Sequence, residues 1–140
     1  MSQILTNVEA SFYRYLYENL TVPHGIPVFE DPFSTNYEDA TRWVVIDTLS
    51  NRLGDQPVQL LFLHLGQRLN APSAKEAQIR LVDQVTAVLD EGTEIPLYDY
   101  ASGDLIGAME VVGTSLQPIM KHRSGGSYRP LTVKLAYPNI

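Results

Sequence analysis

Residues 40–65 read ATRWVVIDTLSNRLGDQPVQLLFLHL and contain two apolar runs on either side of a segment rich in turn-forming residues. The runs at 40–49 and 58–65 are dominated by the β-branched, aromatic and aliphatic residues that favour strands. The intervening NRLGDQP supplies Asn, Gly, Asp and Pro, which reverse the chain direction. This stretch therefore predicts a β-hairpin.

The second strand of this hairpin is apolar on both faces. Side chains alternate across a strand, so Leu60 and Phe62 face one way, whereas Leu61, Leu63 and Leu65 face the other. A strand that is apolar on both faces is covered on both faces. One layer of helices can cover one side, and we expect a second layer or a neighbouring subunit on the other.

The N-terminal segment predicts a helix over about residues 3–19. Spacings of three and four residues give it an apolar stripe, formed by Leu5, Val8, Phe12 and Leu16. Pro23 and Gly25 are expected to end it. Tyrosines crowd the same segment, and those that point away from the stripe predict a second packed surface. The predicted subunit-interface residues are Tyr13, Tyr17, Leu61 and Leu63.

A second helix is predicted over residues 73–91. Ser73 and Glu76 have the capping-box spacing that satisfies free amides at a helix start. One apolar face follows, formed by Ala74, Ala77, Leu81, Val85 and Val88. Gly92 stands where a left-handed residue commonly ends a helix.

The remaining segments favour strands. A short extended piece is expected at 26–29, and IPLYDY at 95–100 is followed by a turn at 101–104 and a further strand. The closing run RPLTVKLAY (129–137) alternates with the period of two that is typical of a half-buried strand. The sequence therefore predicts one α+β domain over 1–140, with a mainly antiparallel sheet packed against two helices.

Composition narrows the function classes. The chain has 140 residues, no cysteine, and 10 basic against 16 acidic residues, which gives a net charge of −6. Without cysteine there are no thiolate nucleophiles, disulfides or cysteine-ligated zinc ions. The negative charge disfavours a protein that wraps nucleic acid, although it suits a surface past which DNA slides. Neither a signal peptide nor a membrane span is expected.

No pattern predicts a catalytic, metal or cofactor site. The SGGS at 124–127 precedes a β pattern, whereas a phosphate loop runs into a helix. The histidines lack the short spacing of metal pairs and stand at His24, His64 and His122. Asp99 and Asp104 could form an acid–base pair or bind calcium, but Asp and Gly at such positions are ordinary turn residues. The residues therefore offer no recognisable catalytic set.

Seven features follow one another along the chain. They are the N-terminal helix, GIPVFEDP (25–32), Trp43-Val44-Val45, SAKEAQIRLVDQVTAVLDE (73–91), IPLYDY (95–100), Ile106-Gly107-Ala108-Met109 and RPLTVKLAY (129–137). In this order, and over most of its length, the chain resembles the tail terminator and head-to-tail joining proteins of long-tailed bacteriophages.

The resemblance implies a structural virion protein that is not an enzyme and uses no cofactor. Such a subunit is made in the host cytoplasm and assembles into a hexameric ring at the neck of the virion. The ring caps the tail tube, stops its elongation and joins the tail to the head connector, with DNA passing through. The implied partners are further copies, the tail tube protein and the connector or neck protein. The alternatives are a head-completion or neck subunit on the portal side, and a small hydrolase or ligand-binding domain with a site made of distant residues.

Residues 120–130, MKHRSGGSYRP, are basic in an otherwise acidic chain. We predict the end of one strand, a flexible tip and the start of the last strand. Its positive charge suits contact with an acidic partner or a passing phosphate backbone, and a solvated hairpin end is the alternative. The predicted contact residues are Lys121, His122, Arg123, Ser124, Gly125, Gly126, Ser127, Tyr128 and Arg129. The acidic pairs Glu30-Asp31 and Glu38-Asp39 are interpreted as solvated loop charges, with an electropositive partner surface as the alternative.

Overall fold

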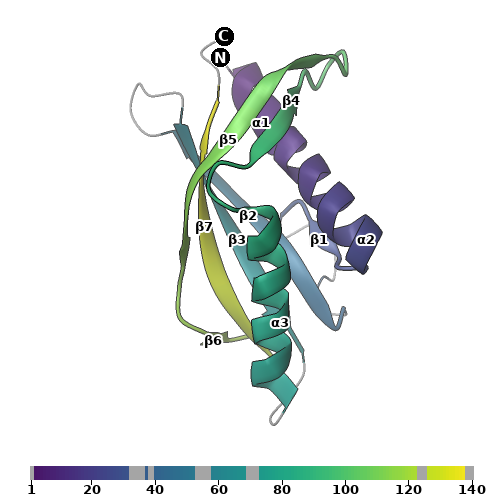
Figure 1. The fold of residues 1–140 in the computed structure, drawn as a ribbon, viewed down its shortest axis with the longest axis vertical. Helices are drawn as coiled ribbons and strands as arrows, with labels where there is room; N and C mark the ends of the chain where they lie inside the picture. The colour runs from purple at the N-terminus through teal and green to yellow at the C-terminus, as the bar shows by residue number, and fades with distance from the viewer. Residues whose placement is uncertain are drawn as a thin grey trace.

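A computed structural model describes residues 2–31, 37, 40–52, 58–68, 73–122 and 126–137. The helical elements are α1 (Ser2–Leu16), the π-helical turn η1 (Tyr17–Thr21), α2 (Val22–His24) and α3 (Ser73–Val88). The strands are β1 (Val28–Phe29), β2 (Arg42–Arg52), β3 (Val58–Gln67), β4 (Glu94–Tyr98), β5 (Leu105–Leu116), β6 (Met120–Lys121) and β7 (Ser127–Ala136). The α+β class predicted from the sequence is confirmed (Figure 1).

The strands form one curled sheet in the order β1-β2-β3-β7-β5-β4, with β6 paired to β7. β1 runs parallel to β2, and the other pairs are antiparallel, so the sheet is mixed rather than purely antiparallel. β2 and β3 form the hairpin predicted at 40–65, with Trp43 opposite Gly66 and Ile46 opposite Leu63. This register fixes which side chains of the hairpin share a face of the sheet.

The N-terminal helix continues beyond its predicted end, because α1 passes through η1 into α2. The Val22 amide donates to the Tyr17 carbonyl, five residues back, which widens the helix by one residue. Pro23 is tolerated in α2 because it has no amide hydrogen to place and the widened turn precedes its ring. Gly25, at φ 67°, then ends the helix in left-handed backbone.

The second helix begins at the predicted residue but ends at Val88, three residues earlier than expected. The Leu89 amide donates to the Thr86 carbonyl at 3.1 Å in a tighter turn. Gly92 has a φ of 91°, and its amide donates to the Val111 carbonyl of β5 at 2.7 Å. Gly92 therefore turns the chain into β4 instead of capping the helix.

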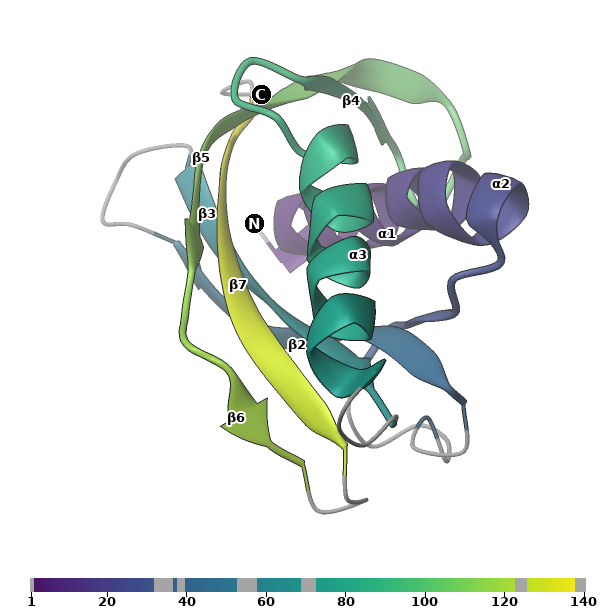
Figure 2. The same ribbon diagram turned by 60° about the horizontal axis from the view of Figure 1, so that its bottom comes forward.

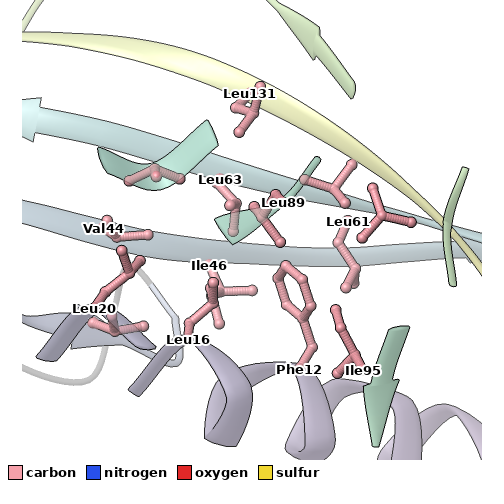
Figure 3. Close-up of a cluster of buried hydrophobic side chains, with 14 of the residues drawn as sticks. Phe12, Leu16, Leu20, Val44, Ile46, Leu61, Leu63, Leu89, Ile95 and Leu131 are labelled. Carbon is pink, nitrogen blue, oxygen red and sulfur yellow. The ribbon is translucent and has the colours of Figure 1, made fainter. Parts of the chain in front are cut away.

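Both long helices lie on the same face of the sheet, so the hydrophobic core is enclosed between them and the strands (Figure 2). Phe12, Leu16 and Leu20 project from the N-terminal helical segment toward Ile46 and Leu63 (Figure 3). The opposite face, called here the outer face, carries no helix in the described part of the chain. The outer face is therefore the side of the sheet that is open to a partner over the described residues.

Side chains of α1 also secure the edge strand β4. The buried Asn7 Oδ1 accepts a hydrogen bond from the Tyr100 amide at 2.8 Å, and the buried Ser11 Oγ accepts one from the Tyr98 amide at 2.9 Å. These contacts satisfy amides that an edge strand would otherwise present to other chains.

Candidate interaction surfaces

β6 and the start of β7 form a hairpin at residues 120–130, as the sequence predicts. Met120 pairs with Tyr128, and Lys121 pairs with Ser127. Three predicted contact residues lie outside the described residues: Arg123, Ser124 and Gly125. The structure therefore places the stem of this hairpin and the residues that flank its tip.

The base of the hairpin is held by close packing and hydrogen bonds. A Cβ on Gly126 would overlap the carbonyl oxygen of Gln67, so the two backbones approach closely only because this residue is glycine. Ser127 Oγ accepts from Gln67 Nε2 at 2.8 Å and donates to Gln78 Oε1 at 3.0 Å. The buried Gln78 also donates to the Leu65 carbonyl at 3.0 Å. Gly126 and Ser127 are therefore anchors, which corrects the expectation that they belong to a flexible tip.

Two further predicted contact residues lie in an aromatic cluster on the outer face. The rings of Trp43 and His122 lie 5.0 Å apart, and those of Trp43 and Tyr37 lie 5.5 Å apart. Tyr128 extends the row, with its ring 5.8 Å from His122 and 5.1 Å from His64. These five residues are called the Trp43 cluster. His122 and Tyr128 thus fix the hairpin against the sheet, a role that sequence spacing gave no means of finding.

Trp43 lies against the backbone of β3 because Gly66 stands opposite it. A Cβ on Gly66 would overlap the Cε2, Nε1 and Cζ2 atoms of the indole. Trp43 is fully buried, and its Nε1 has no hydrogen-bond partner among the described residues. Packing therefore sets the position of the indole, and this packing is possible because Gly66 has no side chain.

The described positive charges of the hairpin belong to Lys121 and Arg129. Lys121 is exposed and forms no ion pair among the described residues. Arg129 Nε donates to the Gln117 carbonyl at 2.8 Å, which ties β7 to the segment between β5 and β6. Ile119 and Met120, each 49% exposed, precede Lys121. Met120 and Lys121 are neighbours in β6, so their side chains point to opposite faces of the hairpin, and both are exposed at its free edge.

The structure corrects two of the predicted interface residues. Leu61 and Leu63 are fully buried in the core beneath the helices, so they present no surface to another chain. The alternation of β3 instead places Leu60 and Phe62 on the outer face, where both side chains are half-buried. The sequence indicated a strand apolar on both faces but did not show which face the helices cover.

The two predicted interface tyrosines lie on α1 and η1, with ring centroids 6.4 Å apart. Tyr17 is 45% exposed. Tyr13 lines a cavity of about 460 Å³ between α1, the end of β1, β2 and the β4–β5 turn. This α1 cavity is lined chiefly by Glu9, Ala10, Tyr13, Glu30, Ile46 and Tyr100, with a further carboxylate from Asp31.

The electrostatics of the α1 cavity favour a cation. Burial raises the pKa of Glu9 above its ordinary value of 4.5. Burial, the nearby carboxylate of Glu30 and the neighbouring Tyr17 raise the pKa of Tyr13. Neither carboxylate forms an ion pair within the described part of the chain. An incoming ammonium or guanidinium group would therefore offset the cost of partly burying Glu9 and would also meet the exposed carboxylate of Glu30.

A second hollow, of about 500 Å³, lies along the exposed side of α3 and includes Ile79, Arg80, Asp83 and Ala87. Its charges are of both signs, and Arg80 already pairs with Glu76 at 3.4 Å. This α3 groove therefore has no comparable preference for one kind of charged ligand.

The polar groups of the β4–β5 turn and of the outer face have structural roles. Asp99 Oδ1 accepts from the Ala101 amide at 2.9 Å, and Gly103 has a φ of 79°, so this segment is a turn. His64 Nε2 lies 3.5 Å from Asp47 Oδ2. Burial lowers the pKa of His64 below 6.5, although Asp47 opposes the shift. No group of three or more His, Asp or Glu side chains within the described ranges is placed to hold a metal ion.

None of the helices in the described part of the chain is long and apolar enough to cross a membrane. No protein-family model matches this chain, and no curated protein gives a match to it.

Proposed function

We propose that this chain is a ring-forming structural subunit of a long-tailed bacteriophage that terminates the tail tube and joins the tail to the head connector. The order of sequence features suggests this role, and the helix-free outer face of the sheet is the observation that carries it. A sheet face is stable in water when it is either polar or covered.

The outer face carries apolar as well as polar side chains, and no helix covers it in the described residues. Phe62 lies opposite Thr132, and His64 lies opposite Pro130, so uncharged side chains continue from β3 onto β7. All four side chains are half-buried within this chain. Leu60 continues the strip along β3, where it lies opposite the exposed Lys134 of β7, and Asp47 of β2 lies opposite Phe62. Burial of such a strip against a second copy would stabilise an assembly at about 25 cal/mol per Å² of apolar surface.

The proposed ring contains six copies, binds the tail tube protein on one side and meets the connector or neck protein on the other. The net charge of −6 per chain favours a channel through which DNA slides without adhering. The exposed Lys121 is then a local site of contact with a partner rather than part of a general DNA-binding surface.

A small ligand-binding domain is the second candidate function, because the α1 cavity is large enough for a small molecule. Oligomeric state separates the two candidates. A protein that stays monomeric both alone and in assembled particles would support the ligand-binding candidate and contradict the ring.

The decisive experiment places a charge on the proposed contact face. Phe62→Glu would leave a carboxylate buried in each ring contact, so we expect folded protein, as judged by circular dichroism, but tails that are overlong and separate from heads. Ile79→Glu is the matched control, because Ile79 is an exposed apolar residue on α3. Normal tails joined to heads with Phe62→Glu would refute the outer face as the contact surface. Normal particles in the complete absence of the protein would refute the function itself.

A further inference from the structure

The α1 cavity is built to receive a side chain that is both cationic and partly apolar. Its walls are supplied by Ala10, Tyr13 and Ile46, whereas Glu9 and Glu30 add negative charge. Aromatic and aliphatic walls pack along the methylene stem of a lysine, and the carboxylates then meet its ammonium group. Small inorganic cations would leave these apolar walls unused.

The free side of the β6–β7 hairpin has the complementary chemistry. Ile119 and Met120 are half-exposed apolar residues in direct sequence with the exposed Lys121. Arg129 holds the hairpin in place through its bond to the Gln117 carbonyl. The hairpin therefore presents an apolar and basic edge on a fixed stem.

The cavity and the hairpin of one chain are built on separate parts of the fold, because the cavity is lined by α1, Glu30, Ile46 and Tyr100, whereas the hairpin is made by β6 and β7. α1 packs on the core face through Phe12, whereas the His122 ring packs against Trp43 on the outer face. Figure 1 also shows α1 and β6 toward opposite ends of the ribbon. Contact between the two surfaces consequently requires two molecules.

We propose that the α1 cavity of one copy receives the β6–β7 hairpin of the next copy, with Lys121 placed between Glu9 and Glu30. The inference rests on the proposed ring and adds a second contact to the one that the outer face makes, because the hairpin stem packs beside that face through His122. Since the two surfaces differ, the contact is head-to-tail, and repetition of such a contact closes a ring when the rotation per subunit permits. Charge complementarity favours the α1 cavity as the site for Lys121. The α3 groove has charges of both signs and offers no such preference.

Disulfide cross-linking tests the contact directly, because the chain has no cysteine of its own. Ala10→Cys lies in the cavity wall and Met120→Cys lies beside Lys121, so the double variant should form a ladder of covalent oligomers on mild oxidation. Each single variant should stop at the dimer. The control pair, Ala87→Cys with Met120→Cys, places the first thiol in the α3 groove and should give no ladder.

Charge reversal tests the pairing within the cross-linkable background. Lys121→Glu or Glu30→Lys alone should lower the ladder yield by roughly tenfold, or about 1.4 kcal/mol of contact energy. An equimolar mixture of the two should restore it, because every contact in an alternating ring again joins opposite charges. Lys75→Glu, an exposed reversal on α3, should leave the yield unchanged.

The outcomes separate this contact from the proposed function. Absence of the Ala10–Met120 ladder, a ladder from the Ala87 pair, or insensitivity to both reversals would overturn the contact. Rings seen on particles without the ladder would overturn the contact but leave the tail function standing. A ladder from a protein that is absent from the tail–head junction would support the contact and overturn the function.

Discussion

The replacement Gly66→Ala gives a direct test of how the outer face is organised. The added Cβ would overlap three atoms of the Trp43 indole, which is fully buried and in ring contact with Tyr37 and His122. The indole cannot swing into open space, so either it or the backbone of β3 must shift. Overpacking of this kind costs about 1–3 kcal/mol, and complete loss of a buried tryptophan costs roughly 3–5 kcal/mol, which bounds the effect from above.

The matched control is Gly113→Ala, in β5 of the same sheet. A Cβ on Gly113 would meet nothing within 4 Å, and the residue does not have a positive φ. Removing a glycine from a strand without a steric clash should be neutral or stabilise by roughly 0.5–1 kcal/mol. The two glycine-to-alanine changes should therefore have opposite signs.

Urea unfolding measures both effects. Trp43 is the only tryptophan in the chain, so its fluorescence reports on the site of the proposed clash while circular dichroism follows the whole domain. Gly66→Ala should also redshift the emission of the folded protein, because a displaced indole contacts water. Equal stability of the two variants, with unchanged emission, would refute the assigned packing of Trp43 on β3.

Two further predictions follow from the core and from the outer face. Leu81→Ala should destabilise the protein by roughly 2–5 kcal/mol in urea unfolding, because Leu81 is buried on the sheet-facing side of α3. Ile79→Ala, on the exposed side of α3, should change the stability far less. Similar losses from the two variants would mean that α3 packs by another face. Burial lowers the pKa of His64 in the folded state, so the folded protein favours the neutral imidazole. The stability due to this residue is therefore fully present above its ordinary pKa of 6.5. It is lost as the pH falls from 6.5 through the lower pKa of the folded state. His64→Gln should flatten this part of the stability–pH curve, and an unchanged curve would assign the pH dependence to other groups.

The hairpin at 40–65 and the α+β class were predictable because both follow from local signals. Alternation of apolar residues and the turn chemistry between the two runs identify strands without any knowledge of distant contacts. The same holds for the start of α3, whereas the bond from the Gly92 amide to β5, which replaces the expected helix cap, joins segments that no local pattern connects.

The candidate surfaces were less predictable. The basic segment at 120–130 was recognisable as a hairpin, and Lys121 does remain exposed. That Gly126 and Ser127 are anchors, however, depends on Gln67 and Gln78, which lie about 50 to 60 residues earlier in the chain.

The sequence by itself determined that β3 is apolar on both faces, because alternation is a property of the strand alone. Only the tertiary structure decided that the helices cover Leu61 and Leu63 and leave Leu60 and Phe62 on the outer face. The reason is that both faces of the strand offer similar apolar surface, so the choice depends on where α1 and α3 can pack together. The α1 cavity follows from the same choice, since it forms where α1 crosses the end of β1 beside Ile46.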